Sequence, residues 1–120
     1  MAGDPSRRIS WLWLAILVVA LVLAAGFAGI QWSIHIGVRN ASDLAVRAYP
    51  AGDRVMALVA FVESEDQPMA ARNRAVWALG QLRDPRALPV LERHYTGSEC
   101  DHARRLCQYE LKKAIDLLRR

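Results

Sequence analysis

The sequence has no side chain with a formal charge at neutral pH from Ile9 to Val38, and His35 is the only titratable group in that stretch. All twenty residues of Trp11–Ile30 are apolar. A helix of twenty residues is about 30 Å long, which matches the hydrocarbon core of a bilayer. A chain of 120 residues cannot bury such a run on all sides in a soluble domain. We therefore expect a membrane-spanning helix over residues 11–34.

Patterns typical of active sites are also missing. The sequence has no Gly-rich phosphate loop, no serine in a plausible His-Asp constellation and no pair of carboxylates in an apolar setting. Its three histidines fall at unrelated positions. We therefore predict no catalytic residue, no bound cofactor and no small-molecule substrate, and we expect a protein that is not an enzyme.

A concentrated basic face is lacking as well. The net charge is +4, and from Asn40 onward thirteen basic residues stand against eleven acidic ones, a net charge of +2. Nucleic-acid binding needs a clustered basic surface, so nucleic acid is not an expected partner. Lysine is scarce, with two residues against fourteen arginines, and alanine is abundant. This bias is typical of GC-rich, mainly bacterial genomes.

Basic residues flank the apolar run unequally. Arg7 and Arg8 lie in the polar segment 1–10, whereas the first basic residue on the other side is Arg39. The excess of positive charge before the span predicts a cytoplasmic N-terminus and a C-terminal part across the membrane. We therefore expect a bacterial inner-membrane protein whose C-terminal domain is periplasmic.

Tryptophans mark both ends of the predicted span, with Trp11 and Trp13 at the inner interface and Trp32 at the outer one. Such an aromatic belt is typical of membrane-spanning helices. Near the outer end, Ala25 and Gly29 form a small-xxx-small pair through which a second helix can approach.

Gly26 and Ala28, small residues at alternate positions before Gly29, also fit the recognition pattern of signal peptidase. Two hypotheses follow: a retained anchor, or a cleaved signal that leaves a soluble periplasmic adaptor. We favour the anchor because the apolar run is long for a signal peptide and continues past the potential cleavage site.

Residues 35–52 are expected to be a linker that contains a short helix. Gly37 weakens a continued helix, and Asn40–Asp43 supplies good N-caps. The short helix would run over Asp43–Tyr49 and stop before Pro50.

Four helices are predicted over residues 53–120. Their boundaries follow from capping residues, prolines and apolar residues at helical spacing. The expected ranges are Asp53–Ser64, Pro68–Leu82, Asp84–Tyr95 and Asp101–Arg119. The two helix pairs repeat after about 32 residues, a period typical of helical solenoids.

The segment Ala71–Leu91 carries a more specific pattern: Ala78-Leu79-Gly80, then Leu82, then Asp84-Pro85. It closely resembles the bacterial HEAT-like repeat, which also occurs in phycobilin lyases. The resemblance implies an all-α protein in which a single transmembrane helix is followed by a short HEAT-like solenoid of about two helix pairs. The second pair departs from the pattern at Tyr109–Lys112, which suits a terminal repeat.

Cysteine is limited to Cys100 and Cys107, and outside the cytoplasm such a pair tends to oxidise. On one helix their Cα atoms would lie about 10 Å apart, so a disulfide requires Cys100 to lie in the preceding turn. Two free thiols are the alternative. Together with His94 and His102 the cysteines form an imaginable zinc set, but the spacing is not that of a standard finger, and we predict no metal site.

Aromatic and arginine residues often dominate protein interfaces. Arg74, Trp77 and Tyr109 are therefore a candidate interaction patch, although Trp77 is also explained as core between repeats, and we favour the core for this residue. These features predict a small accessory or scaffold subunit of a membrane complex, with the membrane and other protein subunits as partners. A secreted adaptor is the alternative, and a bilin or cofactor lyase, suggested only by the resemblance, is a remote one.

Overall fold

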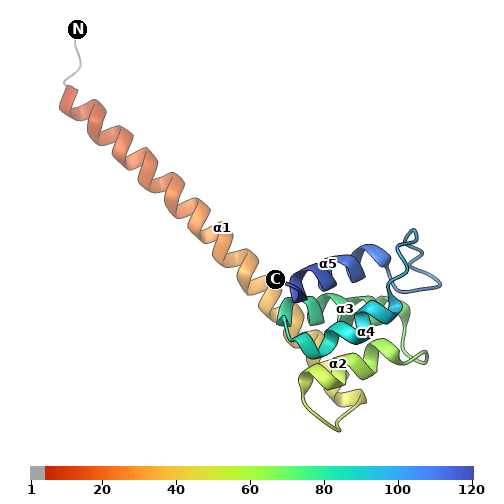
Figure 1. The fold of residues 1–120 in the computed structure, drawn as a ribbon. Coiled ribbons are helices and arrows are strands. Elements are labelled where there is room, and N and C mark those ends of the chain that lie inside the picture. Colours follow the sequence, from red (N-terminus) through yellow and green to blue (C-terminus); the bar gives the residue numbers. More distant parts are fainter. Residues whose placement is uncertain (1–4) are drawn as a thin grey trace. The chain divides into compact units, whose positions relative to one another are not determined.

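The computed structural model describes residues 5–120, so the first four residues of the predicted segment 1–10 lie outside the described residues. All regular elements of the described chain are helices, and it contains no strand. This confirms the predicted all-α class, a long apolar helix followed by a short helical repeat region. The elements are α1 (Pro5–Ala48), α2 (Arg54–Glu63), α3 (Met69–Leu82), the 3-10 turn η1 (Pro85–Ala87), α4 (Leu88–His94) and α5 (Gln108–Leu118) (Figure 1).

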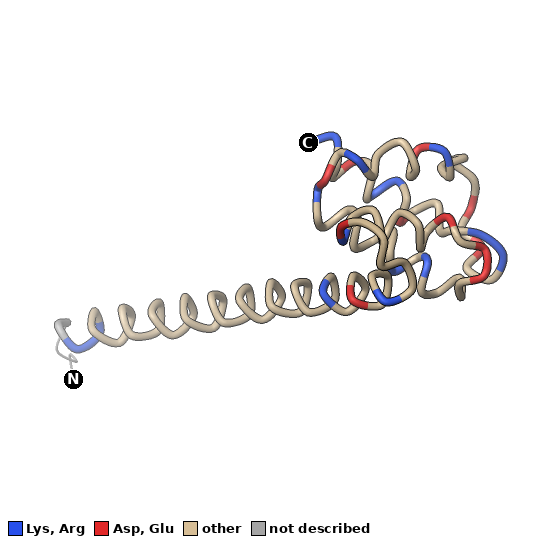
Figure 2. Tube along the Cα trace, turned by 90° about the horizontal axis from the view of Figure 1, so that it is seen from below, with Lys and Arg blue, Asp and Glu red and all other residues tan. Residues whose placement is uncertain are grey.

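The chain divides into two compact units, Met1–Ile34 and His35–Arg120. In the first unit every residue from 7 to 33 is exposed, including Trp11, Trp13 and Trp32. Figure 2 shows the long stretch of α1 that carries neither acidic nor basic residues. Within the described residues α1 is the one helix long and apolar enough to cross a membrane. An added Cβ at Gly26 or Gly29 would meet nothing within 4 Å.

The last part of α1 belongs to the second unit and packs on its core. The helix continues through Gly37 to Ala48, where the sequence predicted a linker with a separate short helix. One face of this part of the helix, which includes Val38, Ala41 and Ala45, is buried. A Cβ at Gly37 would lie 2.9 Å from the ring of Trp77, so glycine is needed here for close helix packing. This packing offsets the roughly 1 kcal/mol that glycine costs within a helix.

Capping residues start the helices of the first pair much as the sequence predicts. Asp53 is the N-cap of α2, and its carboxylate accepts a hydrogen bond of 2.9 Å from the amide of Met56. Pro68 was expected to be the first residue of the second helix. It is instead the N-cap of α3, and the helix begins at Met69. Most of α2 then faces the core, which buries Val55, Ala57, Leu58, Val59, Phe61 and Val62.

Helix α3 lies between α2 and α5 (Figure 1). A Cβ at Gly80 would come within 2.9 Å of both Cα and Cβ of Ala114, so the two helices meet at this glycine with almost no space between them. Ala75, Ala78 and Leu79 on the same helix are buried. The small side chains of the motif thus allow a close approach of the two helices.

The last helix begins later than the sequence predicts. α5 starts at Gln108, seven residues after the predicted Asp101. Gly80 faces Ala114, and the side chain of Asn73 binds the amide of Cys107, so facing residues are 34 apart in both cases. Residues 95–107 are not helical, which the predicted helix from Asp101 did not allow for.

Candidate interaction surface

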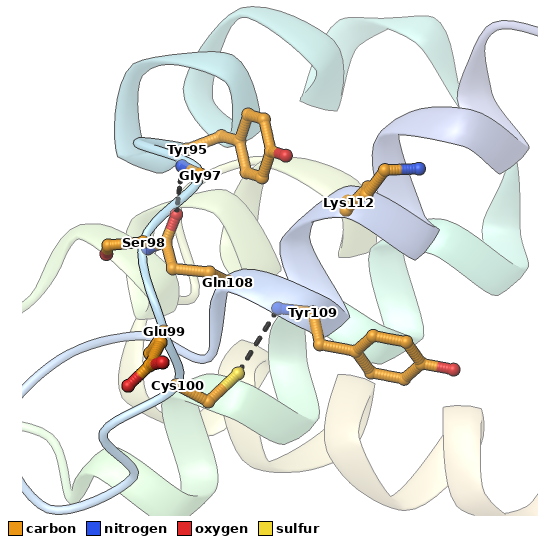
Figure 3. Close-up of a pocket in the computed structure, with 8 residues that line it drawn as sticks. All are labelled: Tyr95, Gly97, Ser98, Glu99, Cys100, Gln108, Tyr109 and Lys112. Atoms are coloured by element: carbon orange, nitrogen blue, oxygen red, sulfur yellow. Dashed lines mark hydrogen bonds between the residues drawn. The ribbon is translucent and has the colours of Figure 1, made fainter.

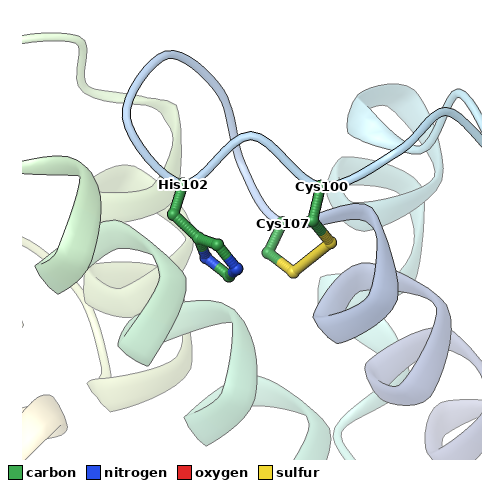
Figure 4. A group of neighbouring side chains, drawn as sticks. All are labelled: Cys100, His102 and Cys107. Atoms are coloured by element: carbon green, nitrogen blue, oxygen red, sulfur yellow. A yellow bond between two sulfur atoms is a disulfide. The ribbon is translucent and has the colours of Figure 1, made fainter.

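Cys100 and Cys107 are joined by a disulfide, with their Cα atoms 4.8 Å apart (Figure 4). Cys100 lies outside any helix and Cys107 is the N-cap of α5, which is the arrangement that a bond over this spacing requires. The bond closes the segment between the two helices of the second pair. It thereby holds the start of α5 and the residues just before it.

Backbone amides and one buried side chain fix this segment further. The amide of Cys107 donates to Oδ1 of Asn73 at 2.8 Å, and the amide of Tyr109 donates to Sγ of Cys100 at 3.3 Å. Gln108 is only 5% exposed, and its Oε1 accepts from the amides of Thr96 at 2.7 Å and Gly97 at 3.3 Å. Its Nε2 donates to two carbonyls, those of His94 and Leu106.

Sequence reasoning placed Gln108 inside the expected helix Asp101–Arg119 and so missed this role. The only signal available was a polar residue directly beside Cys107. In the folded chain Gln108 is the first residue of α5, and a glutamine at this position can reach back to the preceding loop. Gln108 therefore ties the ends of the loop together beside the disulfide.

A surface pocket of ≈ 290 Å³ lies against this segment (Figure 3). Tyr109 lines it with 63% of its surface exposed, and Nζ of Lys113 lies 5.4 Å from the centre of its ring. Such a cation–ring contact holds the aromatic side chain without burying it. The other lining residues are Tyr95, Gly97, Ser98, Glu99, Cys100, Gln108 and Lys112.

The three residues of the candidate patch differ in their surroundings. Arg74 and Tyr109 are exposed, whereas Trp77 is half-buried and packs against the core and Gly37. The contact of Trp77 is therefore with the last part of α1. This leaves Arg74 and Tyr109 as the exposed members of the predicted patch.

The imagined zinc set is brought together only in part. Ligand atoms of Cys100, His102 and Cys107 lie within 4.8 Å of one another (Figure 4), and His94 is not in that group. Both sulfur atoms are engaged in the disulfide, and because a cysteine binds a metal as a thiolate, these two are not free to do so.

The pKa of His94 is lowered, mainly by burial and next by the positive charge of Arg72.

Arg86 forms ion pairs that link the two helix pairs. Its guanidinium lies 2.6 Å from the carboxylate of Asp53 and 2.7 Å from that of Asp84. Two hydrogen bonds to its carboxylate lower the pKa of Asp53. The bond from the amide of Met56 has the larger effect, and the bond from the side chain of Arg86 comes next. The side chain and then the amide of Arg86 lower the pKa of Asp84. Arg93 and Glu63 make a further exposed ion pair of 2.6 Å.

The small-residue helix packing and the capped hairpin are features of helical repeats. The family described as PBS lyase HEAT-like repeat matches residues 71–95, which comprise most of α3, η1 and α4. No curated protein and no solved structure matches the chain. The match supports a HEAT-like repeat protein, a class whose repeats suggest an interaction module.

Proposed function

We propose that the protein is a membrane-anchored HEAT-like interaction module, a small accessory or scaffold subunit of a bacterial inner-membrane complex with no catalytic role. The observation that carries this proposal is the combination of one unburied apolar helix with a HEAT-like repeat in the same small chain. The apolar helix needs lipid around it, because exposed apolar residues over its whole circumference would aggregate in water. The repeat supplies the surface that a partner contacts.

The predicted topology places the repeat domain in the periplasm. The disulfide between Cys100 and Cys107 supports this placement, since disulfides persist in oxidising compartments. Confinement to the membrane plane raises the effective concentration of the domain near a membrane partner. A stack of this length has no wide concave groove, so a modest surface and the anchor together would provide the binding energy.

Photo-cross-linking in native membranes tests the proposal. A photo-reactive amino acid replaces the exposed Tyr109 in the full chain, and cross-linked products are identified by mass spectrometry. We expect one or a few membrane-complex subunits to be captured, and far fewer from the buried-side control position Trp77. Capture of lipid or detergent alone, with the protein running as a free monomer, would contradict the proposed role.

The same mass spectra identify the N-terminal peptide. A mature chain that retains residues 11–34 supports the anchor, whereas a chain that begins near Gly29 identifies a cleaved signal and a soluble adaptor. The choice between the two hypotheses therefore needs no separate experiment.

A further inference from the structure

A second pocket lies where the loop after α2 meets the loop before α5. Its volume is ≈ 270 Å³, and the charged residues that line it are Glu65, Arg72, Arg104 and Arg105. Three of these four carry positive charge and Glu65 is the only carboxylate among the lining residues. We call this site the arginine pocket. It is separate from the pocket beside Tyr109.

Arg72 is the unusual member, because it is a charged residue with only 8% of its surface exposed. Its Nε donates to the carbonyl of Val62 at 2.9 Å, so the side chain is held in one orientation. No carboxylate in the described part of the chain lies within ion-pair distance of it. A buried charge is costly unless it is paired. The carbonyl of Val62 lies in the last turn of α2 and supplies part of the negative charge, so the rest of the counter-charge of Arg72 comes from solvent or from a ligand.

Two further features make the pocket favourable for an anion. Helix α3 begins there at Met69, with no side-chain cap and no acidic residue in its first turn, so no residue of the helix itself neutralises the positive end of its dipole. Arg104 lies in the loop closed by the disulfide and makes no side-chain hydrogen bond or ion pair with a described residue. Arg105 donates to Oγ of Ser98 at 3.1 Å, which fixes it at the rim.

We infer that the arginine pocket binds the carboxylate of an aspartate or glutamate presented by a partner protein. This inference rests on the proposed function, because it assigns a recognition element to the same interaction module. The guanidinium of arginine matches a carboxylate in shape and donates two parallel hydrogen bonds to it. The pocket would thus complete the charge pairing that Arg72 lacks within the chain.

The dimensions of the site favour an acidic side chain over other anions. A volume of ≈ 270 Å³ lies at the lower limit of small-molecule pockets, which start at roughly 300 Å³, and suits one acidic side chain better than a cofactor. Recognition of anionic lipids uses clusters of about four to eight basic residues, and here there are three. The net charge of +2 from Asn40 onward also provides no extended face for a polyanion.

Glu65 should oppose the binding of an acidic ligand, whereas the arginines should favour it. Its carboxylate lines the pocket and makes no ion pair with a described residue. A carboxylate at this position lowers the positive potential that a ligand meets. Replacing it by glutamine should therefore strengthen the binding of an acidic ligand, whereas removing Arg104 and Arg105 should weaken it.

The test uses the full chain in detergent micelles and two blocked tetrapeptides, one of four glutamates and one of four glutamines. Binding is followed by NMR shifts of arginine Nε–H groups at constant ionic strength. We expect the glutamate peptide to bind at least tenfold more tightly than the glutamine peptide. The double variant Arg104→Gln/Arg105→Gln should lose at least tenfold in affinity, and Glu65→Gln should gain about threefold.

Arg54→Gln is the matched control, since Arg54 is exposed on α2 and does not line the pocket. It should leave the affinity unchanged, and thermal unfolding should be the same for all variants. Arg72 is left in place because its bond to Val62 contributes to folding. Equal affinity for the two peptides, or wild-type affinity in the double variant, overturns the inference. Binding of inorganic phosphate without binding of the glutamate peptide overturns it as well.

The inference and the proposed function fail separately. If native-membrane cross-linking captures a partner equally well with the double variant, the arginine pocket is not the recognition site and the interaction role stands. If the glutamate peptide binds but no partner is captured in membranes, the carboxylate site stands and the scaffold role falls.

Discussion

Helix α1 contains two stretches with the same backbone structure and opposite surroundings. From residue 7 to residue 33 every side chain is exposed, although nearly all are apolar. From Val38 to Ala45, in contrast, one face of the helix is buried in the repeat domain through Val38, Ala41, Ser42 and Ala45, while Leu44 remains 49% exposed. Apolar residues on every side of a helix indicate a lipid environment, whereas a single apolar stripe indicates a protein core. The comparison indicates that the distribution of apolar residues, and not the element type, distinguishes the proposed anchor from the repeat domain.

The glycines make the same distinction. Gly29 has open space on all sides, whereas Gly80 touches Ala114 and Gly37 touches Trp77. A glycine in the span leaves a surface where another molecule can approach, and a glycine in the domain is already in use by a neighbouring helix. Substitutions at equivalent residue types should therefore have opposite consequences in the two units.

The largest expected effect is the loss of membrane association. The double variant Val19→Arg/Leu23→Arg places two charges in the middle of the span, each costing about 3 kcal/mol in the bilayer. We expect the protein to move from the carbonate-resistant membrane fraction to the soluble or aggregated fraction. The control Val19→Leu/Leu23→Ile should remain in the membrane. Retention of the arginine variant in the carbonate-washed pellet would show that this helix is not the anchor.

A large residue at Gly80 should unfold or strongly destabilise the repeat domain. In Gly80→Leu the first added carbon already meets Ala114 at 2.9 Å, and such overpacking costs about 3 kcal/mol or more. The matched control is Gly29→Leu, which meets nothing. Thermal unfolding followed by circular dichroism should show a clear drop in Tm for the first variant and none for the second. An unchanged Tm for Gly80→Leu would contradict the close packing of α3 on α5.

Loss of the disulfide should have an intermediate effect. Cys100→Ala opens a short loop, and the chain-entropy relation gives a loss of about 2.5 kcal/mol for a closure of this length. Urea unfolding should show the same loss for wild-type protein treated with dithiothreitol. The variant should not respond to the reductant, which serves as the internal control. A wild-type protein whose unfolding is indifferent to dithiothreitol would argue against the bond.

Local signals predicted the parts of the fold that depend on neighbouring residues. The cap at Asp53, the turn at Asp84-Pro85 and the small residues around Gly80 each determine structure within a few residues, and each lies where the sequence indicated. Gly37 was misleading because its helix cost is offset by Trp77, forty residues away in the sequence. Such a long-range contact leaves no periodic mark in either segment.

The candidate sites were harder to predict for the same reason. The start of α5 at Gln108 depends on the disulfide and on hydrogen bonds to the preceding loop, so the predicted helix from Asp101 was too long. The arginine pocket joins Arg72 with Arg104 and Arg105, which have no common motif. Their proximity follows from the packing of two loops, and one sequence alone does not contain that information.

The smallest expected effect concerns acid stability of the domain. Hydrogen bonds from the amide of Met56 and from Arg86 lower the pKa of Asp53, and Arg86 lowers that of Asp84, in both cases below the ordinary value of 3.8. A carboxylate with a depressed pKa in the folded state stabilises the fold fully at pH above 3.8. This contribution is lost as the pH falls from there through the lowered pKa. Both groups are solvent-exposed, so screening by water and salt keeps the effect small.

The variant Arg86→Gln separates the two causes. It removes the ion pairs with Asp53 and Asp84 but leaves the amide of Met56 to cap α2. Because that amide is the largest cause of the shift at Asp53, the stability of the variant should still fall at acid pH, but less steeply than that of the wild type. Urea unfolding at pH 6, 4 and 3 measures the slope, and Arg54→Gln should follow the wild type. An Arg86→Gln profile that coincides with the wild-type profile would show that the acid sensitivity of the domain comes from the caps alone.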